Sequence, residues 1–204
     1  MASSDAQDRE NGYEKALGFW TVGGQYLHLA KTVANETVDQ GNAHAVITDH
    51  KISLNEYDEK TKWSDHNLVI PILFNFYHGL EVTMKGFICV RDPAIEPSHK
   101  LSKLLEAFKA EYGITELSEL VSKYVVTERL PDLLANFLST SDISIDDYYQ
   151  SLKYAESVKG QKFAHHPLKY QGSAGVQFFI DLRDDITKVI PLAVALGCKE
   201  RKEK

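Results

Sequence analysis

Apolar residues recur at alternating steps of three and four over residues 68–91, which is the spacing of one face of an α-helix. The positions concerned are Ile70, Leu73, Tyr77, Leu80, Met84 and Phe87. Two glycines, Gly79 and Gly86, lie on another face, where they would allow a neighbouring backbone to approach closely. Because little of this helix is purely polar, we expect it to lie at the centre of the fold, covered on most sides.

A second amphipathic helix is predicted shortly after the first. The dipeptide Asp92-Pro93 should end the central helix, since a residue that precedes proline disfavours helical backbone angles. The loop Pro93–Pro97 then leads to Ser98, a residue type suited to capping a helix N-terminus. The apolar stripe that follows should stop at Gly113. The two helices are expected to pack as an antiparallel pair that forms the core unit.

Capping residues, such as Ser53 with Glu56 and Thr115 with Ser118, and apolar periods predict helices in most of the remaining chain. The expected helical ranges are 13–35, 54–63, 115–125, 127–138, 142–149 and 173–198. Residues 37–50 fit either a helix or a short strand, and we take the helix as the expectation. Turn-forming residues gather in residues 139–142 and 151–172, which are therefore expected to be loops.

The pattern as a whole predicts an all-α, antiparallel helical bundle with one domain over residues 12–198. Residues 1–11 are expected to be a disordered tail and residues 199–204 a frayed, charged end. The chain has 204 residues, of which 43% are hydrophobic and 25% are charged. These values are ordinary for a globular domain with its own core.

Charge and cysteine content narrow the class of protein. A net charge of −6 argues against a wholly basic nucleic-acid binder, although a local basic patch could still bind. Cys89 and Cys198 lack metal-binding or redox spacing and indicate reduced thiols in a cytoplasmic protein. No apolar run has the length of a membrane span, and the polar start is unlike a secretory signal, so no membrane partner is expected.

Four polar residues are predicted to meet between the first two helices. His78, Glu81 and Lys85 lie at helical spacing on one arm, and His99 lies at the start of the other. Glu81 and Lys85 also form an ordinary i,i+4 ion pair, and His99 could serve only to secure the loop, so a structural role is the favoured interpretation. In either case Glu81 should be at least partly buried and within reach of Lys85 or His99.

The order of these residues resembles that in HEPN-type helical proteins of prokaryotes. In that family a Glu and a Lys four residues apart precede a His-Asp-Leu or similar triplet that opens the next helix. The matching residues here are Glu81, Lys85, His99 and Leu101, with Lys100 in place of the usual Asp.

The later segment 151–156 is similar to a Leu-Arg-Tyr-Pro-type segment often found downstream in the same family. The resemblance implies a HEPN-like bundle, a homodimer, and a role in prokaryotic phage defence or toxin–antitoxin action. Catalytic members of the family resemble one another in an Arg-x4-6-His motif. Here Arg91 and His99 come closest, but seven residues separate them.

Three hypotheses of function follow. The leading one is an RNA- or partner-binding protein that lacks the ribonuclease motif and is not an enzyme. The second is a metal-independent ribonuclease in which Arg91, His99 and His78 act at a dimer interface. The third is a purely structural, dimeric interaction module. The candidate nucleic-acid patches are two groups of lysines: Lys100, Lys103 and Lys109, and Lys153, Lys159 and Lys162.

Neither a cofactor nor a metal is expected. Nucleotide-binding glycine motifs and the GxSxG nucleophile motif are absent from the sequence. Helical di-metal sites need Glu-x2-His motifs from two helices, whereas the single match here, Glu96 to His99, spans Pro97.

Overall fold

The central helix, α3 (Asp65–Arg91), is buried on all sides over its second half. Every residue from 79 to 90 is buried, including the charged Glu81 and Lys85. The computed structural model describes residues 2–92 and 98–202, with side chains from residue 11 onward. Over these residues it is all-helical, apart from one isolated β-bridge between Glu156 and Lys162. The prediction of an all-α bundle around a covered central helix is confirmed.

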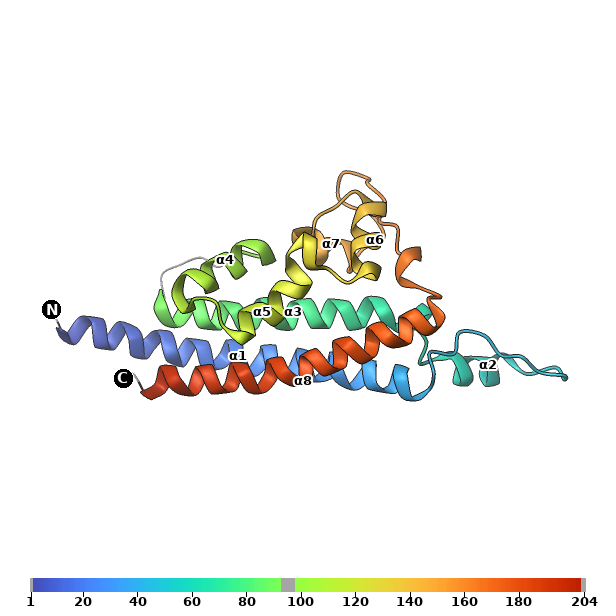
Figure 1. Cartoon of the computed structure of the whole chain (residues 1–204), viewed down its shortest axis with the longest axis horizontal. Coiled ribbons are helices and arrows are strands. Elements are labelled where there is room, and N and C mark those ends of the chain that lie inside the picture. The colour runs from blue at the N-terminus through green and yellow to red at the C-terminus, as the bar shows by residue number, and fades with distance from the viewer. Residues whose placement is uncertain (1, 93–97, 203–204) are drawn as a thin grey trace.

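Three long helices lie alongside one another and form the body of the molecule (Figure 1). They are α3, α1 (Ala2–Asp39) and α8 (Gly172–Lys202), and α1 runs antiparallel to the other two. The expected pairing of α3 with α4 (Leu101–Tyr112) exists, but α3 makes much the larger contact with α1. The main partner of α3 was not identified, because apolar periodicity shows that a face is buried without showing which helix covers it.

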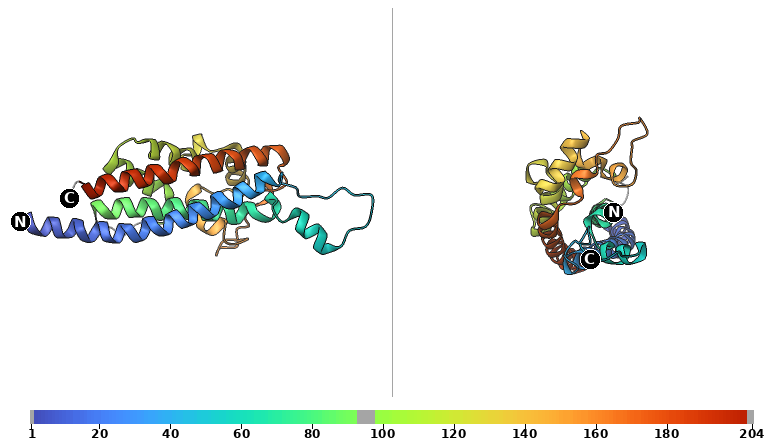
Figure 2. Two further views of the ribbon diagram at one scale, coloured as in Figure 1. Left: turned by 90° about the horizontal axis from the view of Figure 1, so that it is seen from below. Right: turned by 90° about the vertical axis from the view of Figure 1, so that its right-hand side faces the viewer.

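Short helices cover the side of α3 away from α1 and α8, whereas α2 projects from one end of the bundle (Figures 1 and 2). The shorter α-helices are α2 (Leu54–Thr61), α5 (Glu116–Val125), α6 (Asp132–Ser141) and α7 (Tyr148–Ser151). Single 3-10 turns are η1 (Thr127–Arg129), η2 (Ile145–Asp147) and η3 (His166–Leu168). Among the described helices, none has the length and apolarity to cross a bilayer.

Several helix ends follow the predicted capping chemistry. Ser53 accepts a hydrogen bond from the Glu56 amide at 3.2 Å and begins α2. Thr115 and Ser118 exchange hydrogen bonds as a capping box at the start of α5. Gly113 ends α4 with a φ of 72°, a value that a residue without a side chain adopts at little cost.

The start of α4 differs from the prediction. The helix begins at Leu101, and its N-cap is Lys100 rather than Ser98. The Ser98 hydroxyl accepts a hydrogen bond from the Lys100 amide at 3.0 Å, and is thus used in a turn before the helix. The predicted loop Pro93–Pro97 lies outside the described residues.

Helices α1 and α8 extend into both predicted disordered ends. The backbone of residues 2–10 is helical, because adding turns to an existing helix costs far less than nucleating one. Residues 199–202 belong to α8, where the buried Glu200 binds Arg91 at 2.7 Å. Residues 139–141, expected in a loop, form the last turn of α6, which ends at Asp142 with a φ of 51°.

A buried carboxylate fixes the chain where α3 begins. Asp65 is fully buried and accepts hydrogen bonds from the amides of Tyr170 and Gln171, each at 2.8 Å, and from the Asn42 side chain at 3.0 Å. Asp65 is therefore the first residue of α3, which begins three residues before the apolar pattern of residues 68–91. A helix was expected over residues 37–50, but helix α1 ends at Asp39. It ends there because Gly41 and Asn42 adopt positive φ angles of 70° and 53°.

Helices α1 and α3 cross where two glycines face each other. A Cβ atom on Gly23 would lie 2.5 Å from Thr83 Oγ1 and 3.1 Å from the Gly79 carbonyl oxygen. The same atom on the adjacent Gly24 would meet nothing within 4 Å. Of these two glycines, only Gly23 is therefore required by the packing.

We expect Gly23→Ala to lower the free energy of unfolding by about 1–3 kcal/mol, because the added methyl group must push the two backbones apart. Gly24→Ala is the matched control and should raise stability by up to about 1 kcal/mol through helix propensity. Urea unfolding followed by circular dichroism measures both, and equal effects of the two variants would contradict this packing.

Candidate functional site

Helices α3 and α7 and the segment just before α4 meet at the carboxylate of Glu81, whose side chain is only 1% exposed. Lys85 Nζ lies 2.5 Å from Oε1, and His99 Nδ1 lies 2.9 Å from the same oxygen. The Tyr148 hydroxyl donates a hydrogen bond to Oε2. The expectation that Glu81 is buried within reach of Lys85 or His99 is confirmed.

His78 completes the predicted group but makes a weaker contact. Its Nδ1 lies 3.7 Å from Glu81 Oε2, beyond hydrogen-bond distance, and has no hydrogen-bond partner among the described residues. Aromatic rings surround the imidazole, with the Tyr26 centroid at 4.6 Å and the Phe74 centroid at 5.8 Å. His78 thus packs among aromatic rings at the edge of the cluster and takes no part in the close ion pairs of Glu81.

Burial and hydrogen bonding act in opposite directions on the Glu81 carboxyl. Burial alone would raise its pKa, but hydrogen bonds from Lys85 and Tyr148 and the charges of Lys85 and His99 together hold the pKa below its ordinary value. Burial raises the pKa of Tyr148 far above its ordinary value, and its hydrogen bond to the Glu81 carboxylate adds to the rise. Glu81 is therefore the charged partner and Tyr148 the neutral donor.

His99 contacts the buried Glu81 carboxylate on one side of its ring and solvent on the other. Its side chain is 73% exposed, although Nδ1 contacts the buried carboxylate. A carboxylate is the strongest acceptor near Nδ1, so we assign the Nδ1 proton to the Glu81 contact rather than to Lys85, whose Nζ lies 3.3 Å away. With Nδ1 bonded to Glu81, the second ring nitrogen, Nε2, is the one left for a contact from solvent.

An aromatic and cationic surface adjoins His99. The Tyr149 ring centroid lies 6.0 Å from that of His99, and Lys153 Nζ lies 4.8 Å above the Tyr149 ring. Lys153 Nζ also donates to the Tyr149 hydroxyl at 3.3 Å, and this bond raises the pKa of Lys153. We call these three residues the His99–Tyr149–Lys153 surface.

Arg91 belongs to a different contact. Its Nη2 lies 2.7 Å from the buried carboxylate of Glu200, and its guanidinium lies over the Tyr112 ring, 5.2 Å from the centroid. The residue is thus bound to the end of α8, whereas His99 is bound to Glu81. In one chain, the two residues of the predicted Arg–His pair are engaged by different partners.

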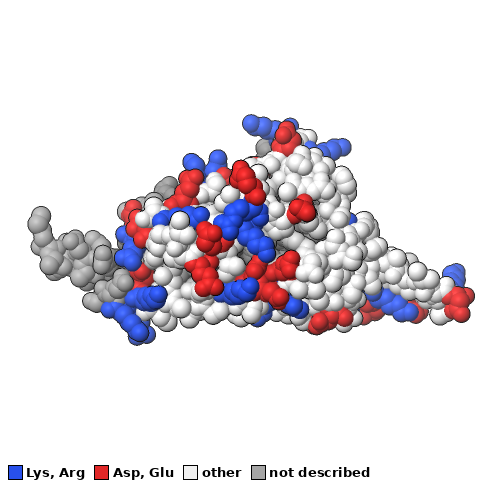
Figure 3. Space-filling model, in the orientation of Figure 1, with Lys and Arg blue, Asp and Glu red and all other residues white. Residues whose placement is uncertain are grey.

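The candidate lysines lie on two separate segments of the chain. Lys100 and Lys103 are exposed on or before α4, whereas Lys109 is half-buried. Lys153, Lys159 and Lys162 are exposed after α7. On the face drawn in Figure 3, Lys and Arg alternate with Asp and Glu, so positive charge is local rather than broad.

The carboxylate cluster does not have the composition of a metal site. Within residues 11–92 and 98–202, no group of three or more His, Cys, Asp or Glu side chains is arranged to hold an ion. Lys85 occupies Glu81 Oε1, the oxygen that His99 also contacts. Glu96, the acidic residue of the Glu-x2-His match, lies outside the described residues.

Sequence reasoning missed the two tyrosines of α7. Tyr148 and Tyr149 are adjacent residues in a four-residue helix and contribute to the cluster and to the surface beside it. A short helix has too few turns to show an apolar period, so neither position carried a usable signal. Lys153 was identified, but only as one cation among several.

Comparisons with protein-family models, curated proteins and solved structures find no match for this chain.

We expect Glu81→Gln to lower the free energy of unfolding by roughly 3 kcal/mol at pH 7, because it leaves the Lys85 ammonium buried without its counter-charge. The folded-state pKa of Glu81 is lowered, so its stabilisation is present above the ordinary value of 4.5 and is lost as the pH falls through the folded value. The difference from wild type should therefore shrink below pH 4.5.

Chemical unfolding at a series of pH values measures this effect. The control is Glu106→Gln on the exposed face of α4, which should change stability by less than about 0.5 kcal/mol. A Glu81→Gln variant as stable as wild type at pH 7 would show that the ion pair is not structural.

Proposed function

We propose that this chain is a HEPN-like helical protein that binds single-stranded RNA without cleaving it. The observation that carries the proposal is the His99–Tyr149–Lys153 surface, in which a half-buried ring lies beneath an exposed ammonium and beside an exposed imidazole. An unpaired base can stack on such rings while the ammonium contacts a phosphate.

The geometry favours a single strand over a duplex. Duplex RNA is bound mainly through phosphates spread over a wide surface, which requires a broad basic face. The net charge of −6 and the interspersed charges of Figure 3 do not provide one. A stacking surface with one or two cations, Lys153 and Lys100, which follows His99 in the sequence, suits a short unpaired segment.

The Glu81 cluster beneath the His99–Tyr149–Lys153 surface should hold the binding side chains in place. His99 is fixed by Glu81 at 2.9 Å, and Tyr148, next to Tyr149, is fixed by the same carboxylate. Side chains held before binding lose less conformational entropy when RNA arrives. The resemblance to HEPN proteins suggests a cellular role in phage defence or toxin–antitoxin action, with RNA as the shared target.

We expect Tyr149→Ala to weaken binding of a fluorescent, unstructured RNA 12-mer roughly 5- to 150-fold, since stacking on one aromatic ring is worth about 1–3 kcal/mol. Lys153→Gln should weaken binding less and reduce the slope of log affinity against log salt by about 1. Fluorescence anisotropy at several salt concentrations measures both variants.

The matched control is Tyr57→Ala, because Tyr57 is an exposed aromatic residue on α2, which projects from one end of the bundle. If Tyr149→Ala and Tyr57→Ala bound RNA equally well, the surface would not be the binding site. If wild type bound no RNA, the protein-partner and purely structural alternatives would replace this proposal.

The Glu81–His99 contact favours ribonuclease activity as a second candidate. A carboxylate that holds Nδ1 and leaves Nε2 exposed prepares a histidine for general acid–base catalysis. Metal-free cleavage also needs a cation at the phosphate. Arg91, the predicted cation, is bound to Glu200 instead, which is why we place binding before cleavage.

We therefore expect no cleavage of total RNA by the pure protein in the presence of EDTA. His99→Ala and Arg91→Ala are the controls, analysed beside wild type on a denaturing gel. EDTA-resistant cleavage that disappears in both variants would favour the ribonuclease and would assign the two residues to one site.

A further inference from the structure

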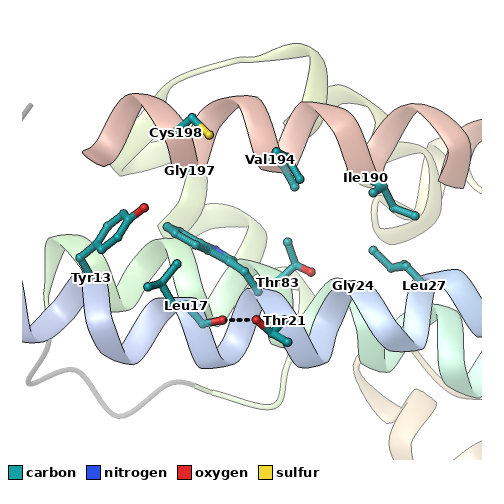
Figure 4. A pocket seen from close by; sticks show the side chains of 12 residues that line it. Tyr13, Leu17, Thr21, Gly24, Leu27, Thr83, Ile190, Val194, Gly197 and Cys198 are labelled. Atoms are coloured by element: carbon teal, nitrogen blue, oxygen red, sulfur yellow. Dashed lines mark hydrogen bonds between the residues drawn. The ribbon is translucent and has the colours of Figure 1, made fainter. Parts of the chain in front are cut away.

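A groove with uncharged walls lies between α1 and α8 (Figure 4). It has a volume of about 220 Å³ and runs along residues 13–27 of α1 and residues 190–198 of α8. None of the side chains that line it is Asp, Glu, Lys or Arg. Leu17 and Val194 at its edges are 40% and 61% exposed, so the groove is open to solvent.

The floor of the groove holds a buried hydroxyl without a partner. Thr83 of α3 lines the groove, is 5% exposed and forms no hydrogen bond with the described part of the chain. Figure 4 shows its side chain near the middle of the groove, between Leu17 and Gly24. The Thr21 hydroxyl nearby differs, because it donates to the Leu17 carbonyl oxygen at 2.8 Å. Since buried polar groups are almost always hydrogen-bonded, the Thr83 hydroxyl is available to pair with a bound molecule.

The size and shape of the groove favour a short linear molecule. At the rise of an α-helix, its lining residues extend over about 21 Å of α1 and about 12 Å of α8. An apolar protein cavity of about 150 Å³ holds a benzene molecule, so about 220 Å³ can hold a molecule of roughly nine heavy atoms. In an elongated groove between two helices, these atoms fit better as a chain than as a ring.

We propose that the groove binds an uncharged, medium-chain aliphatic molecule whose single hydroxyl or carbonyl group pairs with Thr83. A threonine hydroxyl can donate or accept a hydrogen bond, so either group fits. A charged group at the same place would lose its hydration and gain no counter-charge, because no charged side chain lines the groove. Each methylene buried against the apolar walls should strengthen binding by roughly fourfold.

The groove and the His99–Tyr149–Lys153 surface lie on different sides of α3. Helices α1 and α8 form one side, and α4 and α7 form the other (Figure 1). A molecule in the groove therefore leaves the proposed RNA surface open, and this inference stands or falls independently of the proposed function.

Tryptophan fluorescence can report on the groove directly. The chain has two tryptophans, of which Trp20 lines the groove and Trp63 follows α2, so Trp63→Phe leaves Trp20 as the single reporter. Titration of this protein with 1-octanol should give a saturable change in emission. Binding of 1-hexanol should be roughly 15-fold weaker, because two methylenes are missing. Octanoate at pH 7 should bind at least roughly tenfold more weakly than 1-octanol, because its charge has no partner. The absence of saturable binding of 1-octanol, or equal binding of octanoate, would overturn the proposal.

Two glycines of α1 test whether the molecule lies in the groove. A Cβ atom on Gly18 or on Gly24 would meet nothing within 4 Å, so either position accepts a larger side chain. Of the two, only Gly24 lines the groove. Gly24→Leu should fill the groove and weaken binding of 1-octanol at least roughly tenfold, since the buried methylenes lose their place. Gly18→Leu is the matched control and should bind as wild type does. Equal affinities of the two variants would show that the alcohol binds elsewhere.

Thr83→Val tests the polar contact, because it removes the hydroxyl and keeps the shape of the side chain. It should weaken binding of 1-octanol roughly 5- to 10-fold, which is the loss expected for one hydrogen bond. Without ligand the same variant should melt at a higher temperature than wild type, because a buried hydroxyl without a partner is gone. Thr21→Val is the control, since the Thr21 hydroxyl is already bonded to Leu17, and it should change the affinity less than about twofold. A Thr83→Val variant that bound 1-octanol as tightly as wild type would refute the assignment of Thr83.

Discussion

The complete burial of α3 between residues 79 and 90 is the constraint on which the rest of the structure depends. A helix covered on every side must bring its neighbours close and must neutralise its own charges. Gly23 and Gly79 meet the first requirement, because they let α1 approach backbone to backbone. Lys85, at 2.5 Å from Glu81, meets the second. An uncompensated charge in this position would cost several kcal/mol.

The same ion pair gives the short helices their positions. The Glu81 carboxylate can accept more hydrogen bonds than Lys85 alone donates. It therefore also binds Tyr148 from α7 and His99 from the residues before α4. Elements that are far apart in sequence are thus attached to one buried group. A structural explanation of the cluster and a functional one are compatible here, since the group that attaches α7 also fixes the side chains beside it.

Local signals could be read from the sequence, and long-range partners could not. The caps at Ser53 and Thr115 and the stop at Gly113 depend on a few neighbouring residues, and each was predicted. Glu81, Lys85 and His99 were also found, because helical spacing brings the first two together. Tyr148 was missed since it reaches Glu81 across 67 residues, a distance that no short pattern reports. The dominance of α1 over α4 as the partner of α3 has the same cause.

Arg91 illustrates how the ends of the long helices limit the chemistry of the site. Its bond to Glu200 joins the last residue of α3 to the last turns of α8, and Glu200 is buried, so removing Arg91 would leave a buried carboxylate short of a main partner. A guanidinium that met an RNA phosphate would have to leave Glu200 and its position over Tyr112. The energy that stabilises the end of the bundle therefore opposes use of Arg91 in catalysis. Binding at His99, Tyr149 and Lys153 carries no such conflict, because Lys153 is exposed and its contacts among the described residues are with exposed or half-buried rings.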